Sequence, residues 1–205
     1  MTDAGRVIAG TARGTRLQSP GTGTRPLGDR VKETLFAILE PDLAGARVLD
    51  LFAGSGAGGI EALSRGATAT VFVERDSGAC QVIAENLRRA RAPERASVVR
   101  ADAIKYLAER GATDGPFDVV LIDPPYAEPQ LLEAALAGLA AAASALLSPR
   151  AWVVAKHFWR TPPPQAVGLL ASVRTRRFGE TALAFYRREG PSLTEPSPRP
   201  EEAAR

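Results

Sequence analysis

Five short apolar segments alternate with helical segments between residues 46 and 156, and this alternation constrains the fold more than any other feature. The apolar segments, which predict strands, are residues 46–52, 70–74, 97–100, 117–123 and 151–156. The segments that predict helices are residues 59–65, 77–89, 103–110 and 130–147. Near-continuous apolar strands joined by helices are typical of a parallel sheet covered by helices on both faces.

The remaining predicted elements lie at the two ends of this alternating region. Beyond the prolines at 162–164 we expect a short helix and two strands, near 173–178 and 182–186. These two strands should be antiparallel, because the few residues between them cannot form a crossover. Before the region, residues 7–9 are compatible with a short strand, and a helix begins at Asp29 and ends before Pro41. The predicted fold is α/β, with a mostly parallel seven-stranded sheet, an antiparallel last strand and helices on both faces.

Composition divides the chain into three parts. Residues 1–40 are expected to form a basic arm, mobile or partly ordered, followed by a helix. Residues 41–188 should form the α/β domain, and residues 189–205, with four prolines, a disordered tail. One Cys and one His exclude a disulfide scaffold and a multi-cysteine zinc site, and no carboxylate cluster suggests a metal. Residues 1–10 lack an apolar signal segment and residues 131–147 are too short to span a bilayer, so we expect a cytoplasmic protein with no membrane partner.

Positive charge is concentrated near the start of the chain. The net charge is +3, yet residues 1–32 alone hold six basic and two acidic side chains. Such a patch is typical of a protein that binds a polyanion, although 23 Arg against 3 Lys is also what an arginine-rich proteome would produce. The residues predicted to contact RNA phosphates are Arg6, Arg13, Arg16, Arg25, Arg30 and Lys32.

A glycine-rich segment follows the first strand of the alternating region. Gly54, Gly56 and Gly59 have the G-x-G-x-x-G spacing, in which glycines let the backbone turn tightly and approach a ligand closely. Glu74 ends the next strand, where its carboxylate can accept hydrogen bonds from ribose hydroxyls. These features alone fit a nicotinamide dinucleotide as well as any other adenosine cofactor.

Two carboxylates favour S-adenosylmethionine over a dinucleotide. Asp50 lies four residues before Gly54, where it would repel a pyrophosphate and attract the sulfonium and ammonium groups. Asp102 follows the third strand, where it can bind an adenine amino group, cap the next helix, or do both. The predicted cofactor-binding residues are Asp50, Phe52, Ala53, Gly54, Ser55, Gly56, Glu74, Arg75, Asp102, Ala103 and Asp123.

The chemistry is predicted at a tetrad, Asp123-Pro124-Pro125-Tyr126, directly after the fourth strand. The carboxylate of Asp123 and the rigid carbonyl of Pro124 can accept hydrogen bonds from one exocyclic amino group, and the ring of Tyr126 can stack on a base. This arrangement orients the amino nitrogen for in-line attack on a methyl carbon. Positioning and desolvation would then supply the rate enhancement, and no strong base is needed. A Pro-Pro pair after a strand can also be only a rigid turn.

The sequence resembles the RsmD family of bacterial 16S rRNA guanine-N2 methyltransferases from Arg6 to about Tyr186. The matching segments are residues 6–10, 13–14, 24–26, 29–33, 35–36, 48–56, 61–67, 72–74, 123–126 and 179–181. The resemblance implies a Rossmann-like S-adenosylmethionine-dependent methyltransferase fold and methylation of one guanine N2 in 16S rRNA, by a monomer on a partly assembled small ribosomal subunit. Departures from the family pattern, which concern fine target specificity, are Leu27-Gly28, Gly58, and Lys156-His157 where Glu-His is usual.

Other functions stay open on the sequence alone. An adenine N6 methyltransferase acting on DNA or RNA would use the same tetrad, because adenine also carries an exocyclic amino group. A nicotinamide oxidoreductase would explain the glycine spacing and Glu74, but neither Asp50 nor the tetrad. A non-enzymatic RNA-binding module would explain the basic arm but not the cofactor loop. His157 is interpreted as the polar end of a buried strand, with contact to RNA as the alternative.

Overall fold

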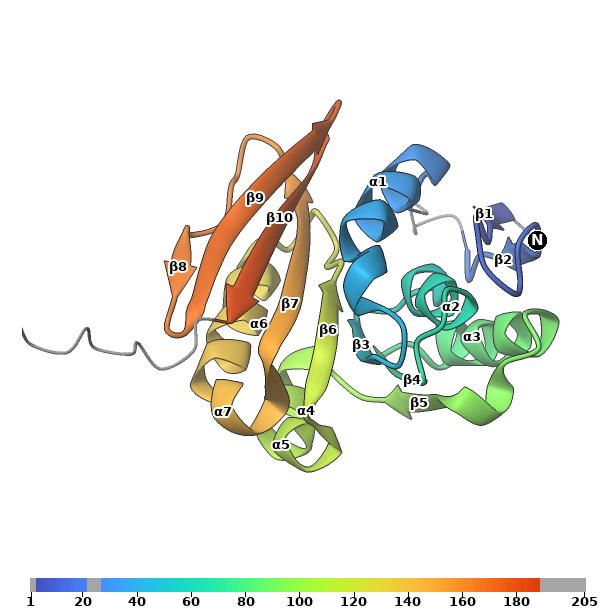
Figure 1. Cartoon of the computed structure of the whole chain (residues 1–205), viewed down its shortest axis with the longest axis horizontal. Helices are drawn as coiled ribbons and strands as arrows, with labels where there is room; N and C mark the ends of the chain where they lie inside the picture. The colour runs from blue at the N-terminus through green and yellow to red at the C-terminus, as the bar shows by residue number, and fades with distance from the viewer. Residues whose placement is uncertain (1–2, 22–26, 189–205) are drawn as a thin grey trace, which may run out of the picture.

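An eight-stranded sheet forms the centre of the computed structural model, which describes residues 3–21 and 27–188 (Figure 1). The strand order is β5-β4-β3-β6-β7-β10-β9-β8. The strands of the alternating region are parallel: β3 (Arg47–Leu51), β4 (Ala69–Glu74), β5 (Ala96–Arg100), β6 (Phe117–Ile122) and β7 (Leu147–Phe158). Three antiparallel pairings complete the sheet, through β8 (Ala166–Val167), β9 (Leu170–Phe178) and β10 (Thr181–Arg188).

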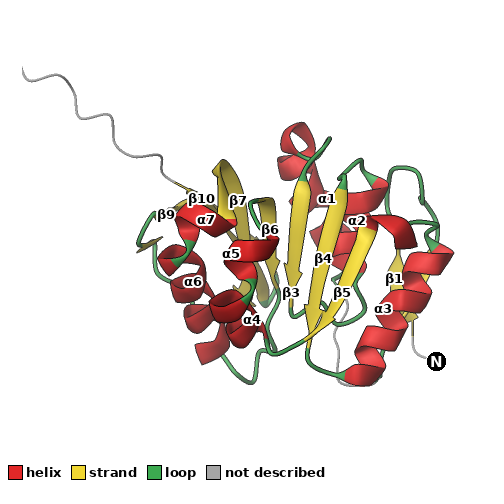
Figure 2. Cartoon of the chain, turned by 90° about the horizontal axis from the view of Figure 1, so that it is seen from below, coloured by secondary structure: helices red, strands yellow, loops and turns green. Residues whose placement is uncertain are grey.

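Helices cover both faces of this sheet, as Figure 2 shows. One face carries α1 (Asp29–Leu39), α2 (Ala57–Ser64) and α3 (Ser77–Arg89), whose apolar side chains share a core with Val48 and Phe72. The other face carries α4 (Ala103–Glu109), α5 (Gly111–Asp114), α6 (Gln130–Ala141) and α7 (Ala143–Leu146), and its core includes Leu49 and Val73. Neighbouring strand residues enter opposite cores because side chains alternate along a strand. No described helix is both long and apolar enough to cross a membrane.

Three predicted elements differ in the structure. The helix expected over 130–147 is interrupted at Ala142, whose ψ of 9° ends α6 before α7 begins. The short helix expected after the prolines is instead the edge strand β8, which a turn at Gly168 (φ 54°) pairs with β9. The strand considered at 7–9 is replaced by an antiparallel pair, β1 (Asp3–Arg6) and β2 (Arg16–Gln18). Apolar spacing does not distinguish these cases, since small residues fit either conformation.

The arm is fixed to the domain over residues 3–21. Ala4, Val7 and Leu17 are buried in the same core as α1 and α2. The fully buried carboxylate of Glu61, on α2, accepts the N–H groups of Ile8 at 2.7 Å and Ala9 at 3.0 Å. Of the two alternatives expected for the arm, mobile or partly ordered, these residues fit the second, because hydrogen bonds and apolar contacts hold the segment. The predicted tail (189–205) and Arg25 lie outside the described residues.

Candidate functional site

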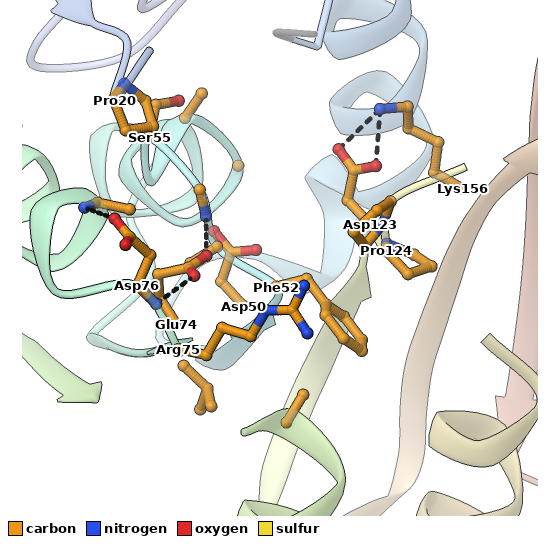
Figure 3. A pocket seen from close by; sticks show the side chains of 18 of the residues that line it. Pro20, Asp50, Phe52, Ser55, Glu74, Arg75, Asp76, Asp123, Pro124 and Lys156 are labelled. Atoms are coloured by element: carbon orange, nitrogen blue, oxygen red, sulfur yellow. Dashed lines mark hydrogen bonds and ion pairs between the residues drawn. The ribbon is translucent and has the colours of Figure 1, made fainter. Parts of the chain in front are cut away.

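A cavity of about 780 Å³ lies at the carboxyl ends of β3, β4 and β6 (Figure 3). Ligands of open α/β sheets bind at this edge, and the volume is within the usual range for small-molecule sites. Its described lining holds five carboxylates against two basic side chains, Arg75 and Lys156. All the predicted cofactor residues and the whole tetrad line it, with the exception of Gly56.

Gly56 shapes the loop from beneath the cavity. It has a φ of 75°, and a Cβ at this position would come within 3.2 to 3.4 Å of Ile83, Phe72 and Ile60. The role predicted for Gly56, direct cofactor binding, is corrected to a backbone turn that begins α2. Phe52 does line the cavity and has a φ of 60°, which is uncommon for a residue with a side chain and is typical of functional sites.

The N–H groups of the glycine loop are bound to internal acceptors. Gly54 donates to the carboxylate of Glu74 at 2.9 Å, and Gly59 donates to Asp50 at 2.8 Å. Gly56 donates to the carbonyl of Ala53 at 2.7 Å. A dinucleotide-binding loop uses such N–H groups to bind pyrophosphate oxygens. Here two of the three donors are bound to carboxylates, so the loop disfavours a pyrophosphate on both hydrogen-bonding and electrostatic grounds.

Asp50 is a buried carboxyl group at the floor of the cavity, with 4% of its surface exposed. Burial, and to a lesser extent the charges of Asp123 and Glu74, raise its pKa to about 8, while the hydrogen bond from Gly59 opposes the rise. A positively charged ligand would favour the ionised form of this carboxyl group. With five carboxylates against two basic side chains in its lining, the cavity suits a cationic ligand.

Glu74 and Asp102 each hold a backbone segment and also face the cavity. Besides Gly54, Glu74 accepts the N–H of Asp76 at 2.9 Å. Asp102 is the N-cap of α4, and its Oδ1 accepts the N–H groups of Ile104 and Lys105. Each carboxylate has about four acceptor positions, so both keep capacity for a ligand. The two interpretations of Asp102, helix cap and ligand contact, are compatible.

Lys156 makes a two-point ion pair with Asp123 in the centre of the site. Its Nζ lies 2.7 Å from Oδ1 and 2.9 Å from Oδ2 (Figure 3). Burial raises the pKa of Asp123, while the charge and hydrogen bond of Lys156 lower it. Lys156 therefore favours the ionised, accepting form of the tetrad carboxylate. It lies two residues before the end of β7, the parallel neighbour of β6, and this pairing of the two strands brings it into the site.

Tyr126 stands at the mouth of the cavity, with 36% of its surface exposed. Its Oη is hydrogen-bonded to Oγ1 of Thr181 at 2.8 Å, and Nζ of Lys156 lies 5.2 Å from its ring centroid. Both contacts hold the ring beside Asp123. His157, the next residue along β7, is buried on the opposite side of the strand and its Nδ1 is hydrogen-bonded to the carbonyl of Phe158.

The basic residues predicted to bind RNA have different environments. Arg13 and Arg30 are exposed, Arg6 pairs with Asp29 at 3.3 Å, and Arg16 pairs with Asp3 at 3.1 Å. Lys32 is wrong as a phosphate contact, because its side chain is fully buried and its Nζ donates to the carbonyl of Arg6. Its burial also lowers the pKa of Lys32. Lys32 attaches α1 to the arm.

Known proteins with matching sequences identify the family. A family model described as conserved hypothetical protein 95 matches residues 5–187. YlbH of Bacillus subtilis (strain 168), named provisionally as an rRNA methyltransferase, is 39% identical over 186 residues, which are 90% of this chain and 100% of YlbH. The chain belongs to the RsmD/YlbH family. The predicted family membership is thereby confirmed. Ribosomal RNA small subunit methyltransferase D of Escherichia coli (strain K12) is 43% identical over 122 residues, or 59% of this chain and 60% of that protein.

Solved structures of similar proteins confirm the fold. The structure of yhhF from Escherichia coli, described provisionally as a methyltransferase, has a TM-score of 0.81 at 34% identity, over 91% of this chain and 98% of that chain. An RNA methyltransferase from Salinibacter ruber in complex with S-adenosyl-L-homocysteine has a TM-score of 0.61 at 17% identity, over 83% of this chain and 97% of that chain. The predicted Rossmann-like methyltransferase fold is confirmed, with β8 as an eighth strand beyond the seven expected.

Proposed function

We propose that this RsmD/YlbH family member transfers a methyl group from S-adenosylmethionine to the exocyclic N2 of a guanine in 16S rRNA. The observation that carries the proposal is the cavity in which Asp123, Pro124 and Tyr126 adjoin a glycine loop whose Gly54 and Gly59 N–H groups are bound to carboxylates. The rRNA target is supported by the relative named small subunit methyltransferase D, which shares 43% identity over 122 residues.

The residues around the glycine loop fit S-adenosylmethionine. Glu74 would hold the ribose hydroxyls and Asp102 the adenine amino group, because both carboxylates line the cavity and keep acceptor capacity. Asp50 would face the ammonium group of the amino acid end, which the acidic lining favours. When bound, this cofactor supplies an electrophilic methyl carbon on a positively charged sulfur. Residue by residue, the site suits that cofactor better than a nicotinamide dinucleotide.

The tetrad would hold the target amino group by two acceptors. The carboxylate of Asp123, paired with Lys156, accepts one N–H of the amine. The carbonyl of Pro124 accepts the second, since no backbone N–H among the described residues donates to it. With both N–H groups bound, the nitrogen lone pair is directed away from them, and the ring of Tyr126 stacks on the base. The methylated amine then loses a proton to water, for which no strong base is required.

RNA would be held by the exposed arginines of the arm and of α1, principally Arg13 and Arg30. We also propose that the protein acts as a monomer on a partly assembled small subunit. Pro20 and Gly21 of the arm line the cavity, so RNA bound along the arm would lie beside the site. Guanine N2 and adenine N6 are both exocyclic amines, and the tetrad alone accepts either.

Transfer of radiolabelled methyl groups tests the function. The purified protein is incubated with labelled S-adenosylmethionine and unmodified 16S rRNA, small subunits or genomic DNA, and the products are digested to nucleosides. We expect N2-methylguanosine from the RNA substrates. Asp123→Ala should abolish transfer, whereas Asp118→Asn, which changes a carboxylate at the opposite end of β6, should retain it. N6-methyladenine as the product, or the absence of transfer to any nucleic acid, would refute the proposal.

A further inference from the structure

A second concentration of positive charge lies in the last strands of the sheet. Residues 151–188 contain seven basic residues and one acidic residue, Glu180. Three of the seven are bound inside the fold: Lys156 to Asp123, Arg187 to Asp42, and Arg188 to the carbonyl of Leu147. The other four are exposed and lie near the turn between β9 and β10: Arg160, Arg174, Arg176 and Arg177.

The turn of the β9–β10 hairpin lies at the edge of the sheet that carries the cavity. Thr181, the first residue of β10, pairs with Phe158 at the carboxyl end of β7, which runs parallel to β6. The same Thr181 is hydrogen-bonded to Tyr126 at 2.8 Å. The hairpin therefore borders the tetrad, and in Figure 1 it extends beyond the ends of the parallel strands.

Arg174 and Arg176 lie on the face of the sheet that carries Lys156. Across the hairpin, Arg176 is opposite Leu183, and Leu183 is opposite Lys156 on β7. Directly opposed residues share a face, and neighbouring strands are about 4.8 Å apart, so the backbones of Arg176 and Lys156 are about 10 Å apart. Arg174, opposite Phe185, lies on this face too. Register thus places both arginines on the Lys156 face of the sheet, with Arg176 level with Lys156.

Arg177 lies on the other face of the same strand. It is opposite Ala182, and its guanidinium stacks over the ring of Trp159 at 3.5 Å from the centroid. Arg160 lies over the same ring at 5.0 Å. Strand β9 thus carries two exposed arginines, Arg174 and Arg176, on the face that holds Lys156. Arg177 has the same charge and a neighbouring position but lies on the opposite face. This difference provides a matched control within one strand.

We propose that Arg174 and Arg176 bind backbone phosphates of the RNA strand whose base enters the cavity. Guanidinium groups match phosphate oxygens in geometry and charge, and phosphate contacts position a nucleic acid without reading its sequence. A base that enters the site brings its flanking phosphates to the cavity rim, which the hairpin borders. Pro20 and Gly21 of the arm also line the cavity, and in Figure 1 the arm strands β1 and β2 lie beyond α1 from the hairpin. The strand is then held on both sides of the flipped base. This inference rests on the proposed function, since it needs an RNA substrate.

The salt dependence of RNA binding tests the inference. Affinity for unmodified 16S rRNA is measured by fluorescence anisotropy between 50 and 200 mM salt, for the wild type, Arg174→Gln/Arg176→Gln, Arg174→Lys/Arg176→Lys and Arg177→Gln. Each phosphate contact contributes about 0.7 to 0.9 to the slope of log affinity against log salt. We expect the double Gln variant to lose about 1.4 to 1.8 from the slope, and the Lys variant and Arg177→Gln to keep the wild-type value. The KM for RNA should rise in the double Gln variant, with kcat and S-adenosylhomocysteine affinity unchanged.

The outcomes separate this inference from the proposed function. An unchanged slope in the double Gln variant, or an equal loss in Arg177→Gln, overturns the hairpin contact while wild-type methylation still stands. A wild-type protein that binds S-adenosylhomocysteine but neither binds nor methylates rRNA overturns both. Binding of S-adenosylhomocysteine, measured by calorimetry in each variant, shows that the folded cofactor site is intact, because Arg174 and Arg176 do not line it.

Discussion

Binding of S-adenosylmethionine should release a proton from Asp50. The pKa of this carboxyl group is raised to about 8 by burial, so it is mostly neutral at pH 7 in the empty protein. Removing that proton at pH 7 costs about 1.4 kcal/mol, the equivalent of one pKa unit. A unit positive charge at about 4 Å contributes about 4 kcal/mol at an effective dielectric constant of about 20. Because the attraction exceeds the cost, a cationic ligand should bind the ionised form.

The affinity for S-adenosylmethionine should therefore rise with pH until Asp50 is already ionised in the empty protein. Between pH 6 and pH 8 the expected increase is about 50-fold, and at pH 7 about 0.9 proton should leave per ligand bound. Isothermal titration calorimetry at pH 6, 7 and 8, in two buffers that differ in ionisation enthalpy, measures both quantities. Asp50→Asn keeps a side-chain oxygen that can accept the N–H of Gly59, which lies 2.8 Å from Oδ2 of Asp50 in the wild type, but the amide cannot titrate. It should bind more weakly and without this pH dependence.

Two results would contradict this reasoning. The first is equal wild-type affinity at pH 6 and pH 8, and the second is the same pH dependence in Asp50→Asn. Stability provides an independent check on the pKa of Asp50. Its folded-state value of about 8 lies above the unfolded value of about 3.9, so between them the folded state holds a proton that the unfolded state has lost. The contribution of Asp50 to stability is thus lost as pH rises through this window, and the melting temperature of Asp50→Asn should fall less from pH 5 to pH 8.

Three further predictions concern the tetrad and the arm. Asp123→Ala should abolish turnover and leave S-adenosylhomocysteine affinity nearly unchanged; single-turnover activity near the wild-type rate would remove Asp123 from the mechanism. Lys156→Met should raise the pKa of Asp123, since it removes the charge that opposes the effect of burial, and should shift the pH profile of kcat upward; an unshifted profile would limit Lys156 to a structural role. Glu61→Ala should lower the free energy of unfolding by about 3 kcal/mol in urea, because two partly buried N–H groups lose a charged acceptor; unchanged stability would mean that the other contacts of the arm, such as those with Ser64 and Asn86, are sufficient to hold it.

The sequence predicted those elements whose signal lies in consecutive residues. Helix α3 spans Ser77–Arg89 as expected, because its apolar spacing is strong and Asp76 caps its first turn with a hydrogen bond of 2.7 Å to the N–H of Ala79. The parallel strands follow from short, nearly continuous apolar segments. Since the carboxyl ends of such strands meet at one edge, Asp50, Glu74 and Asp123 could be placed around one cavity before their distances were known.

Interactions between distant segments were not predictable in this way. Lys156 lies 33 residues from Asp123, and the two meet because β6 and β7 are parallel neighbours. Lys32 has a basic side chain of the kind that binds phosphate, yet packing of α1 against the arm buries it. Arg176 joins the cavity side of the sheet through the register of β9 on β10. Local sequence thus determined the order of strands and helices and the chemical groups at their ends. Only tertiary packing decided which charges meet, which are buried and which face a ligand, because those outcomes depend on neighbours that the chain brings together from far apart.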